Sequence, residues 1–223
     1  MREKLAGVLF GGSCFLCRGA TRGLLCAQCE AELPRLSALL CPRCALESPG
    51  AAVCGRCLAE PPAYDATCAA LAYEFPADAL VHSLKFRGEL ALAPLLAGLL
   101  APRIGDEPVD LIVPVPLSGE RLRSRGYNQA LEIARHLGRA APEPALCERT
   151  RDARPQMDLP YAERRRNVRG AFRCRRALIG ARVAVVDDVM TTGATLDEMA
   201  RTLKQSGAVR VVNWVVARTL PHD

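Results

Sequence analysis

The most informative part of the sequence is Val183-Ala184-Val185-Val186-Asp187-Asp188-Val189-Met190-Thr191-Thr192-Gly193-Ala194-Thr195. Its apolar residues predict a buried strand over Arg182–Asp187. Two adjacent carboxylates come at the end of that strand, and a loop of small and hydroxyl-bearing residues follows. Thr195 with Glu198 three residues later fits a capping box, which predicts a helix over Leu196–Ser206. The stretch therefore predicts a strand, a polar loop and a helix in succession.

The loop has the chemistry of an anion site. Backbone N–H groups, threonine hydroxyls and the start of a helix all favour a bound phosphate. Gly193 allows the backbone to approach a ligand closely. Asp187 and Asp188 suit the hydroxyl groups of a sugar, directly or through a hydrated Mg²⁺. Two adjacent carboxylates repel each other unless something cationic binds, so we favour a site over a surface turn. The Gly-x-x-x-x-Gly-Lys-Ser/Thr pattern of nucleotide-triphosphate loops is absent from the sequence.

The rest of the C-terminal part alternates between strand and helix patterns. Strands are predicted over Thr67–Phe75, Leu111–Val115 and Val209–Ala217, and helices over Ala77–Lys85, Leu90–Leu100 and Tyr127–Arg139. This alternation predicts an α/β domain with a parallel sheet and helices on both faces, whose ligands bind beyond the carboxyl ends of the strands. Leu58–Asp65, with two consecutive prolines, is the predicted linker. We therefore expect a small module over 1–62 and a second domain over 63–223.

The cysteines of the N-terminal part form a repeated pattern. Eight of the 11 cysteines make four Cys-x-x-Cys pairs: Cys14/Cys17, Cys26/Cys29, Cys41/Cys44 and Cys54/Cys57. This spacing is typical of zinc ribbons, in which four thiolates surround a structural Zn²⁺. A segment so poor in apolar residues needs such a metal to fold. We expect two structural zinc sites. Sequential pairing (first pair with second, third with fourth) is favoured, and interleaved pairing remains the alternative.

Composition sets the class of protein. The chain has 223 residues, of which 50% are hydrophobic and 24% charged, so disordered and collagen-like classes are excluded. No apolar run reaches the length of about 18 residues that a membrane span needs. Leu5–Phe10 is too short for the apolar part of a signal peptide. We expect a cytoplasmic protein without a membrane span, whose reducing surroundings favour metal ligation over disulfides.

Positive charge is concentrated in one segment. The net charge is +6, and Arg149–Arg176 holds ten arginines against three acids. Such a segment suits phosphate groups, either of a small ligand or of a DNA backbone, although a solvated charged face is the plainer alternative. Aromatic residues make up only 4% of the chain, so sequence-specific reading of bases is not expected. The candidate DNA-binding residues are Arg164, Arg165, Arg166 and Arg169.

These motifs together resemble a known family. Val183–Leu196 resembles the phosphoribosyl pyrophosphate (PRPP) signature of type I phosphoribosyltransferases. The cysteine pairs, together with four further motifs, resemble the competence protein F (ComF) family over essentially the whole chain. These motifs are Leu84-Lys85-Phe86-Arg87-Gly88, Val113-Pro114-Val115-Pro116 with Arg121, Arg125-Gly126-Tyr127-Asn128-Gln129, and the region of Gln156 and Arg166-Asn167.

The resemblance implies a type I phosphoribosyltransferase-like fold and a role for each motif. Asp187 and Asp188 would bind the ribose hydroxyls of Mg²⁺-bound PRPP, and Lys85 and Arg87 would lie in the hood over the acceptor. Residues 151–169 would close over the site. The 5′-phosphate would lie on Thr191, Thr192, Gly193, Ala194 and Thr195. The loop Pro116–Arg125 would bind pyrophosphate through Arg121, Arg123 and Arg125.

Two hypotheses follow from this resemblance. The first is a Mg²⁺-dependent phosphoribosyltransferase of the ComF type, in which a nucleophile attacks C1′ of PRPP and pyrophosphate leaves. The family is associated with competence, DNA uptake and natural transformation, so the second is a non-catalytic adapter that binds single-stranded DNA and other competence proteins. PRPP binding is expected under both, and the acceptor cannot be read from Phe75–Arg87.

Overall fold

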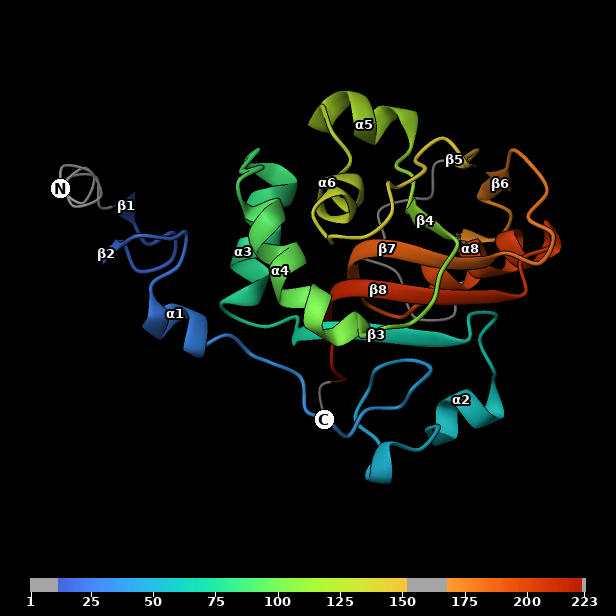
Figure 1. Cartoon of the computed structure of the whole chain (residues 1–223), viewed down its shortest axis with the longest axis horizontal. Coiled ribbons are helices and arrows are strands. Elements are labelled where there is room, and N and C mark those ends of the chain that lie inside the picture. Colours follow the sequence, from blue (N-terminus) through green and yellow to red (C-terminus); the bar gives the residue numbers. More distant parts are fainter. Residues whose placement is uncertain (1–11, 152–167, 222–223) are drawn as a thin grey trace, which may run out of the picture.

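A four-stranded parallel sheet forms the centre of the molecule (Figure 1). The computed structural model describes residues 12–151 and 168–221. The strand order is β3 (Ala66–Ala72), β8 (Arg210–Arg218), β7 (Arg182–Met190) and β4 (Leu111–Pro114). Helices flank the sheet, and two cysteine modules precede it along the chain. The predicted α/β class with a parallel sheet is therefore confirmed.

Both faces of the sheet are covered because β7 is apolar on both sides. Its side chains point alternately to opposite faces, as in any strand. Ala184 and Val186 pack with the helices α3 (Ala77–Phe86), α4 (Leu92–Ile104) and α6 (Gln129–Arg135). Val183 and Val185 pack on the other face with α8 (Ala194–Gln205). The continuous apolar run in the sequence thus corresponds to a strand that is buried on both faces.

The two cysteine modules lie on opposite sides of the sheet edge formed by β3. The first module contains β1 (Gly12–Ser13), β2 (Ala20–Thr21) and α1 (Ala27–Ala31), and the second contains η1 (Pro49–Ala51) and α2 (Gly55–Ala59). Cysteines of the first belong to the core cluster beneath α3 and α4, and those of the second to the cluster beneath α8. Each module therefore extends a different core.

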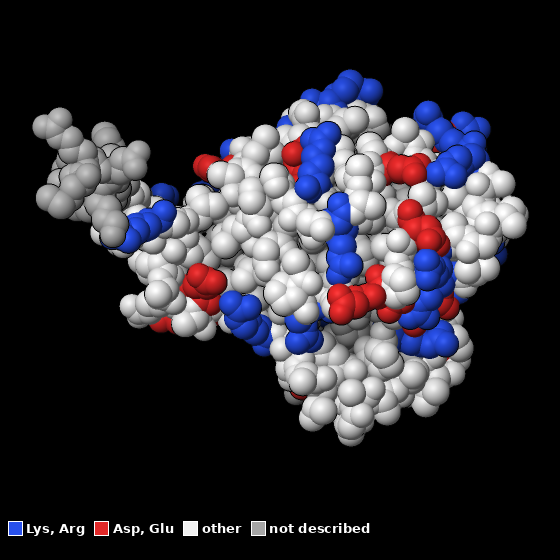
Figure 2. All heavy atoms as spheres, in the orientation of Figure 1, with Lys and Arg blue, Asp and Glu red and all other residues white. Residues whose placement is uncertain are grey.

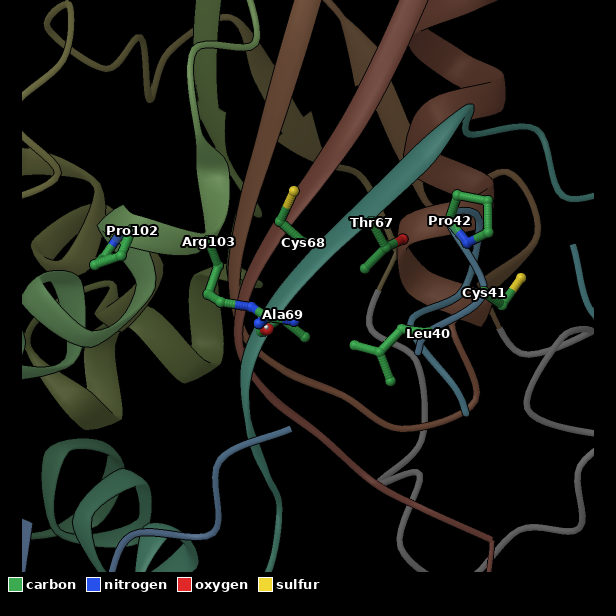
Figure 3. A pocket seen from close by; sticks show the side chains of 8 residues that line it. All are labelled: Leu40, Cys41, Pro42, Thr67, Cys68, Ala69, Pro102 and Arg103. Atoms are coloured by element: carbon green, nitrogen blue, oxygen red, sulfur yellow. Dashed lines mark hydrogen bonds between the residues drawn. The ribbon is translucent and has the colours of Figure 1, made fainter. Parts of the chain in front are cut away.

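The connection between the modules covers the edge of β3. Leu36 N–H donates to the Ala70 carbonyl at 3.2 Å, and Thr67 N–H donates to the Pro42 carbonyl at 3.0 Å. A cavity of about 230 Å³ remains between these contacts, with Leu40, Cys41 and Pro42 on one side and Thr67, Cys68 and Ala69 on the other (Figure 3). Arg103 closes it from α4 by donating to the Ala69 carbonyl at 3.2 Å. Covering an exposed strand edge in this way limits pairing with other chains.

The predicted strands and helices are present, but their bounds differ by a few residues; β3 ends at Ala72 rather than Phe75, and α4 extends to Ile104 rather than Leu100. β7 runs three residues beyond Asp187, because it stays paired with β8 as far as Met190 and Arg218. The helix predicted over Tyr127–Arg139 is shorter, since Asn128 caps its start and Gly138 adopts a positive φ after its end. The segment Pro116–Arg125, expected to be a loop, contains the helix α5 (Gly119–Arg125).

The predicted capping box is wrong. Helix α8 begins at Ala194, and Gly193 occupies the capping position with a φ of 85°. Thr195 lies inside the helix, and Glu198 accepts a hydrogen bond from the Gly170 N–H at 2.7 Å instead of closing a box. The left-handed glycine therefore outweighs the local Thr-x-x-Glu pattern.

The linker predicted over Leu58–Asp65 begins within α2, whose last residue is Ala59. In the described parts of the chain, none of the helices is both long and apolar enough to cross a membrane. Arg164, Arg165 and Arg166 lie outside the described residues. The domain boundary between 62 and 63 stays a prediction.

Asn128 connects the end of β4 to α6. Its side-chain oxygen accepts from the Ala130 N–H at 3.0 Å, and its amide nitrogen donates to the Val115 carbonyl at 3.0 Å. We expect Asn128→Ala to lower the free energy of unfolding by about 1–2 kcal/mol, because both the cap and the link to β4 are lost. Asn128→Asp, which keeps the cap, should lose less. Urea denaturation measures both, and equal midpoints for Asn128→Ala and wild type would contradict this assignment.

Candidate functional site

A cavity of about 870 Å³ opens at the carboxyl ends of β4 and β7. Its size falls in the range of small-molecule sites, and its place is the one expected for a ligand of a parallel sheet. Most of the predicted site residues line it together: Asp187, Asp188, Thr191, Thr192, Gly193, Ala194, Thr195, Lys85, Arg121 and Arg125. Arg123 and Arg87 are not among the described residues that line it. The cavity thus unites residues that lie more than 100 positions apart in the sequence.

The acid pair lies at the floor of this cavity. Asp188 is 2% exposed, and its Oδ2 lies 2.9 Å from the Lys85 Nζ of α3. Burial lowers the pKa of Lys85, but the charge of Asp188, the hydrogen bond to it and the charge of Asp187 together outweigh this, so the net shift is upward. Desolvation and the neighbouring Asp188 charge raise the pKa of Asp187 to about 8. The pair therefore has one cationic partner in place and would gain from a second.

The phosphate loop, defined as Thr191–Thr195, packs against Met190 and Tyr64. Gly193 has no room for a side chain, because a Cβ there would lie 2.7 Å from Met190 Cε and 3.1 Å from Tyr64 Oη. Thr192 Oγ1 accepts from the Ala194 N–H at 3.3 Å within the loop. The 12-residue helix α8 follows directly, so its N-terminal N–H groups lie at the cavity wall. This is the arrangement that favours a bound anion.

Cationic side chains of α5 also reach this cavity. Arg121 and Arg125 line the cavity, whereas Arg123 turns back over Gly119. Arg125 donates to Gln129 Oε1 and lies over the Phe86 ring, with Cζ 5.2 Å from the centroid. These contacts hold the Arg125 guanidinium at the cavity before any ligand binds.

Aromatic residues at the cavity were not predicted as site residues. Tyr73, Phe86 and Tyr127 line it, and Phe86 is 63% exposed. The Tyr127 hydroxyl donates to the Leu84 carbonyl, which places the end of α3 and the adjacent Lys85. Phe86 and Tyr127 belong to the motifs Leu84–Gly88 and Arg125–Gln129 that resemble the family. These motifs indicate that the two segments matter, but they do not show which side chains meet at the cavity. Arg149, at the end of β5 (Cys147–Arg149) and the start of the basic segment, also lines the cavity, although it was not named as a site residue.

The eight cysteines form two separate clusters, which confirms sequential pairing. In each cluster the four Sγ atoms lie within 4.8 Å of one another: Cys14, Cys17, Cys26 and Cys29 in the first, and Cys41, Cys44, Cys54 and Cys57 in the second. The two repeat each other in detail. Cys26 N–H donates to Cys14 Sγ and Cys54 N–H to Cys41 Sγ, both at 3.3 Å. Four convergent thiolates fit a structural zinc ion.

Much of the basic segment is paired with acids. Arg173 and Arg175 ion-pair with Glu148, the latter at 2.6 Å, and Arg176 ion-pairs with Glu143 at 2.9 Å. These residues lie on and beside the ribbon of β5 and β6 (Phe172–Cys174). Figure 2 shows basic side chains with acidic ones next to them over this end of the molecule. Arg169 is exposed. The charge available to a DNA backbone is thus smaller than the sequence count indicates.

Comparison with known proteins identifies the family. Residues 5–58 match the family described as "Double zinc ribbon domain". DNA utilization protein YhgH of Salmonella typhimurium is 35% identical over 94% of this chain and 98% of its own length. Competence protein F of Haemophilus influenzae is 31% identical over the same shares. The chain belongs to the competence protein F family.

A more distant relative extends this family. Competence protein ComFC of Bacillus subtilis is 24% identical over 87% of this chain and 84% of its own length. This ComF-family chain therefore carries a double zinc ribbon with two zinc-binding sites of four cysteines each, as the sequence predicted.

Sequential pairing has a direct test in pairs of substitutions. Cys14→Ser with Cys29→Ser alters the first cluster alone, so one zinc ion per chain should remain. Cys14→Ser with Cys41→Ser alters both clusters and should leave none. Elemental analysis of the purified proteins measures the zinc content. Interleaved pairing would give the opposite result for each pair.

The Lys85–Asp188 ion pair should behave as a buried pair. We expect Lys85→Met to lower the free energy of unfolding by about 3 kcal/mol, because the Asp188 carboxylate is left without its cation. Adding Asp188→Asn should recover most of the loss. Chemical denaturation of the wild type, both single variants and the double variant gives the coupling energy. If Asp188→Asn costs the same free energy in the wild-type and Lys85→Met backgrounds, the coupling energy is zero and the two side chains do not interact.

Proposed function

We propose that this ComF-family chain binds PRPP with Mg²⁺ in the cavity at the ends of β4 and β7. The observation that carries the proposal is the convergence of an acid pair, a phosphate loop and two arginines on one cavity. A phosphorylated pentose needs the first two, since its phosphate takes N–H donors and its hydroxyls take carboxylate acceptors. The resemblance of Val183–Leu196 to the PRPP signature supports the same ligand.

The charges around the cavity fit a ligand with phosphates at both ends. The phosphate loop would take the 5′-phosphate, and Asp187 and Asp188 would accept hydrogen bonds from the ribose hydroxyls. Arg121 and Arg125 line the same cavity, where they would neutralise pyrophosphate. Carboxylate oxygens are the ligands that Mg²⁺ prefers, so the acid pair also fits a hydrated magnesium ion. When bound, that ion would neutralise charge on the pyrophosphate.

We infer that the chemistry, if an acceptor enters, is displacement at C1′ with loss of pyrophosphate. The residues of the chain would contribute by position and charge. The hood end of α3 is held by the Tyr127–Leu84 hydrogen bond, and it carries Lys85 toward the acid pair. Arg125 is already fixed by Gln129 and Phe86. Such preorganised cations stabilise a leaving group that carries negative charge.

Calorimetric titration tests the binding proposal. We expect one Mg²⁺-PRPP site per zinc-loaded chain and no measurable binding to the variant Asp187→Asn with Asp188→Asn. Arg123→Met is the matched control for Arg121→Met, because only Arg121 lines the cavity; Arg121→Met should weaken binding about tenfold. Unchanged binding by the double Asn variant would exclude this site. Pyrophosphate release in the presence of a panel of bases then separates turnover from binding alone.

A second candidate function is binding of single-stranded DNA. The relatives named DNA utilization protein and competence protein favour it. The residues proposed for this contact are Arg164, Arg165, Arg166 and Arg169, and other competence proteins are further candidate partners. The described arginines of β6 and its neighbours are paired with acids, so these four carry the proposal.

Salt dependence separates DNA binding from nonspecific charge. We expect the triple variant Arg164→Ala, Arg165→Ala and Arg166→Ala to bind single-stranded DNA more weakly and with a shallower dependence on salt. Fluorescence anisotropy with a labelled oligonucleotide measures both. Arg135→Ala, which removes an exposed arginine of α6 that is paired with Glu132, serves as the control. An unaltered slope in the triple variant would assign its charge to solvent or to PRPP alone.

A further inference from the structure

Arg218 is a buried arginine behind the phosphate loop. It is the last residue of β8, pairs in register with Met190 and is 1% exposed. Its Nη1 donates to the Met190 carbonyl at 2.9 Å and to the Thr191 carbonyl. The guanidinium therefore holds the backbone at the point where β7 ends and the phosphate loop begins.

The same side chain reaches the second zinc ribbon. Arg218 Nε donates to the carbonyl of Cys44 at 2.8 Å, and Cys44 is one of the four cysteines of the second cluster. One rigid fork of N–H donors thus connects a metal-ligating residue to the phosphate loop. The two segments lie almost 150 positions apart in the sequence.

The charge of Arg218 needs a partner. Across 12–151 and 168–221 its hydrogen-bond acceptors are carbonyl groups, and no carboxylate lies within ion-pair distance of it. Burial lowers the pKa of this guanidinium. A divalent ion with four thiolates leaves a zinc centre with net negative charge. The loaded second ribbon therefore supplies a counter-charge close to the buried cation.

A second contact joins the same two parts. Tyr64, in the linker after the second ribbon, is 3% exposed and packs against Gly193 of the phosphate loop. The Ala63 N–H donates to Asp197 Oδ1 in the first turn of α8 at 2.6 Å. The first ribbon packs in the core cluster of the opposite face instead. The second ribbon, through the linker after it, thus contacts the phosphate loop and α8, whereas the first ribbon packs on the other face of the sheet.

We propose that Arg218 is a positioning residue through which the loaded second zinc centre holds the phosphate loop in its binding conformation. Zinc at the second ribbon and an anion in the loop then stabilise each other, since such coupling is reciprocal. The identity of that anion as PRPP rests on the proposed function. The coupling between ribbon and loop does not.

Hydrogen exchange tests the coupling without any ligand. In zinc-loaded full-length protein, we expect Arg218→Met to increase amide exchange of the peptide that covers Met190–Thr195 by about tenfold or more. Exchange in β4 should stay unchanged. Arg218→Lys, which keeps the charge but not the fork, should restore part of the protection. Arg103→Met is the matched control, because Arg103 also bonds backbone carbonyls but at the β3 edge.

The reverse experiment starts from the metal. Cys44→Ser should raise exchange in the same peptide, whereas Cys17→Ser in the first ribbon should leave it unchanged. These two variants also decide the question if Arg218→Met fails to fold. Equal protection of Met190–Thr195 in Arg218→Met and wild type, or equal effects of Cys44→Ser and Cys17→Ser, would overturn the proposal.

PRPP titration then separates this proposal from the proposed function. If wild type binds Mg²⁺-PRPP, Arg218→Met should bind about tenfold more weakly, and PRPP should slow the release of one of the two zinc ions to a chromogenic chelator. The slowing of zinc release should be absent in Arg218→Met and present in Arg103→Met, and Arg103→Met should bind PRPP as the wild type does. If wild type does not bind PRPP, the proposed function fails, and the exchange experiments still decide the coupling.

Discussion

The register of β7 against β8 is the constraint on which the rest of the site depends. Because the two strands stay paired to Met190 and Arg218, the acid pair, the start of the phosphate loop and a buried guanidinium all come to one end of the sheet. A shift of one residue would turn Asp187 and Asp188 each to the other face of the sheet and would move Arg218 away from the loop. The apolar residues of β7, buried on both faces, make such a shift costly.

The zinc ribbons contribute more to this domain than an appended module would. They lie on the two sides of the β3 edge, and the connection between them covers that edge. Their metal replaces the apolar core that so short a segment lacks. The second ribbon also shares the core beneath α8 with the strands of the sheet. Residues of the second ribbon and of the sheet that carries the phosphate loop are therefore buried in one common core.

Local patterns in the sequence predicted the elements, whereas contacts between distant segments were not accessible to it. The buried strand follows from the apolar run Val183–Val186, and the two metal clusters follow from the spacing of the cysteines. Both patterns involve only residues that are close in sequence, so both structures were predicted. The predicted capping box is wrong because the helix starts at Ala194, with Gly193 in a left-handed conformation at the capping position. Thr195 and Glu198 fit the local pattern but both lie inside the helix. Arg218 carries no local signal, since its role follows from register alone. The Lys85–Asp188 pair likewise depends on how α3 packs over the sheet.

The most direct test of the central claim is a crystal structure of the zinc-loaded protein with Mg²⁺ and PRPP. We expect the 5′-phosphate on Thr191–Thr195, the ribose hydroxyls at Asp187 and Asp188, and the pyrophosphate toward Arg121 and Arg125. We also expect Arg218 to remain bonded to the Met190, Thr191 and Cys44 carbonyls, as it is without the ligand. Electron density for PRPP at another place, or an empty phosphate loop at saturating PRPP, would contradict the account.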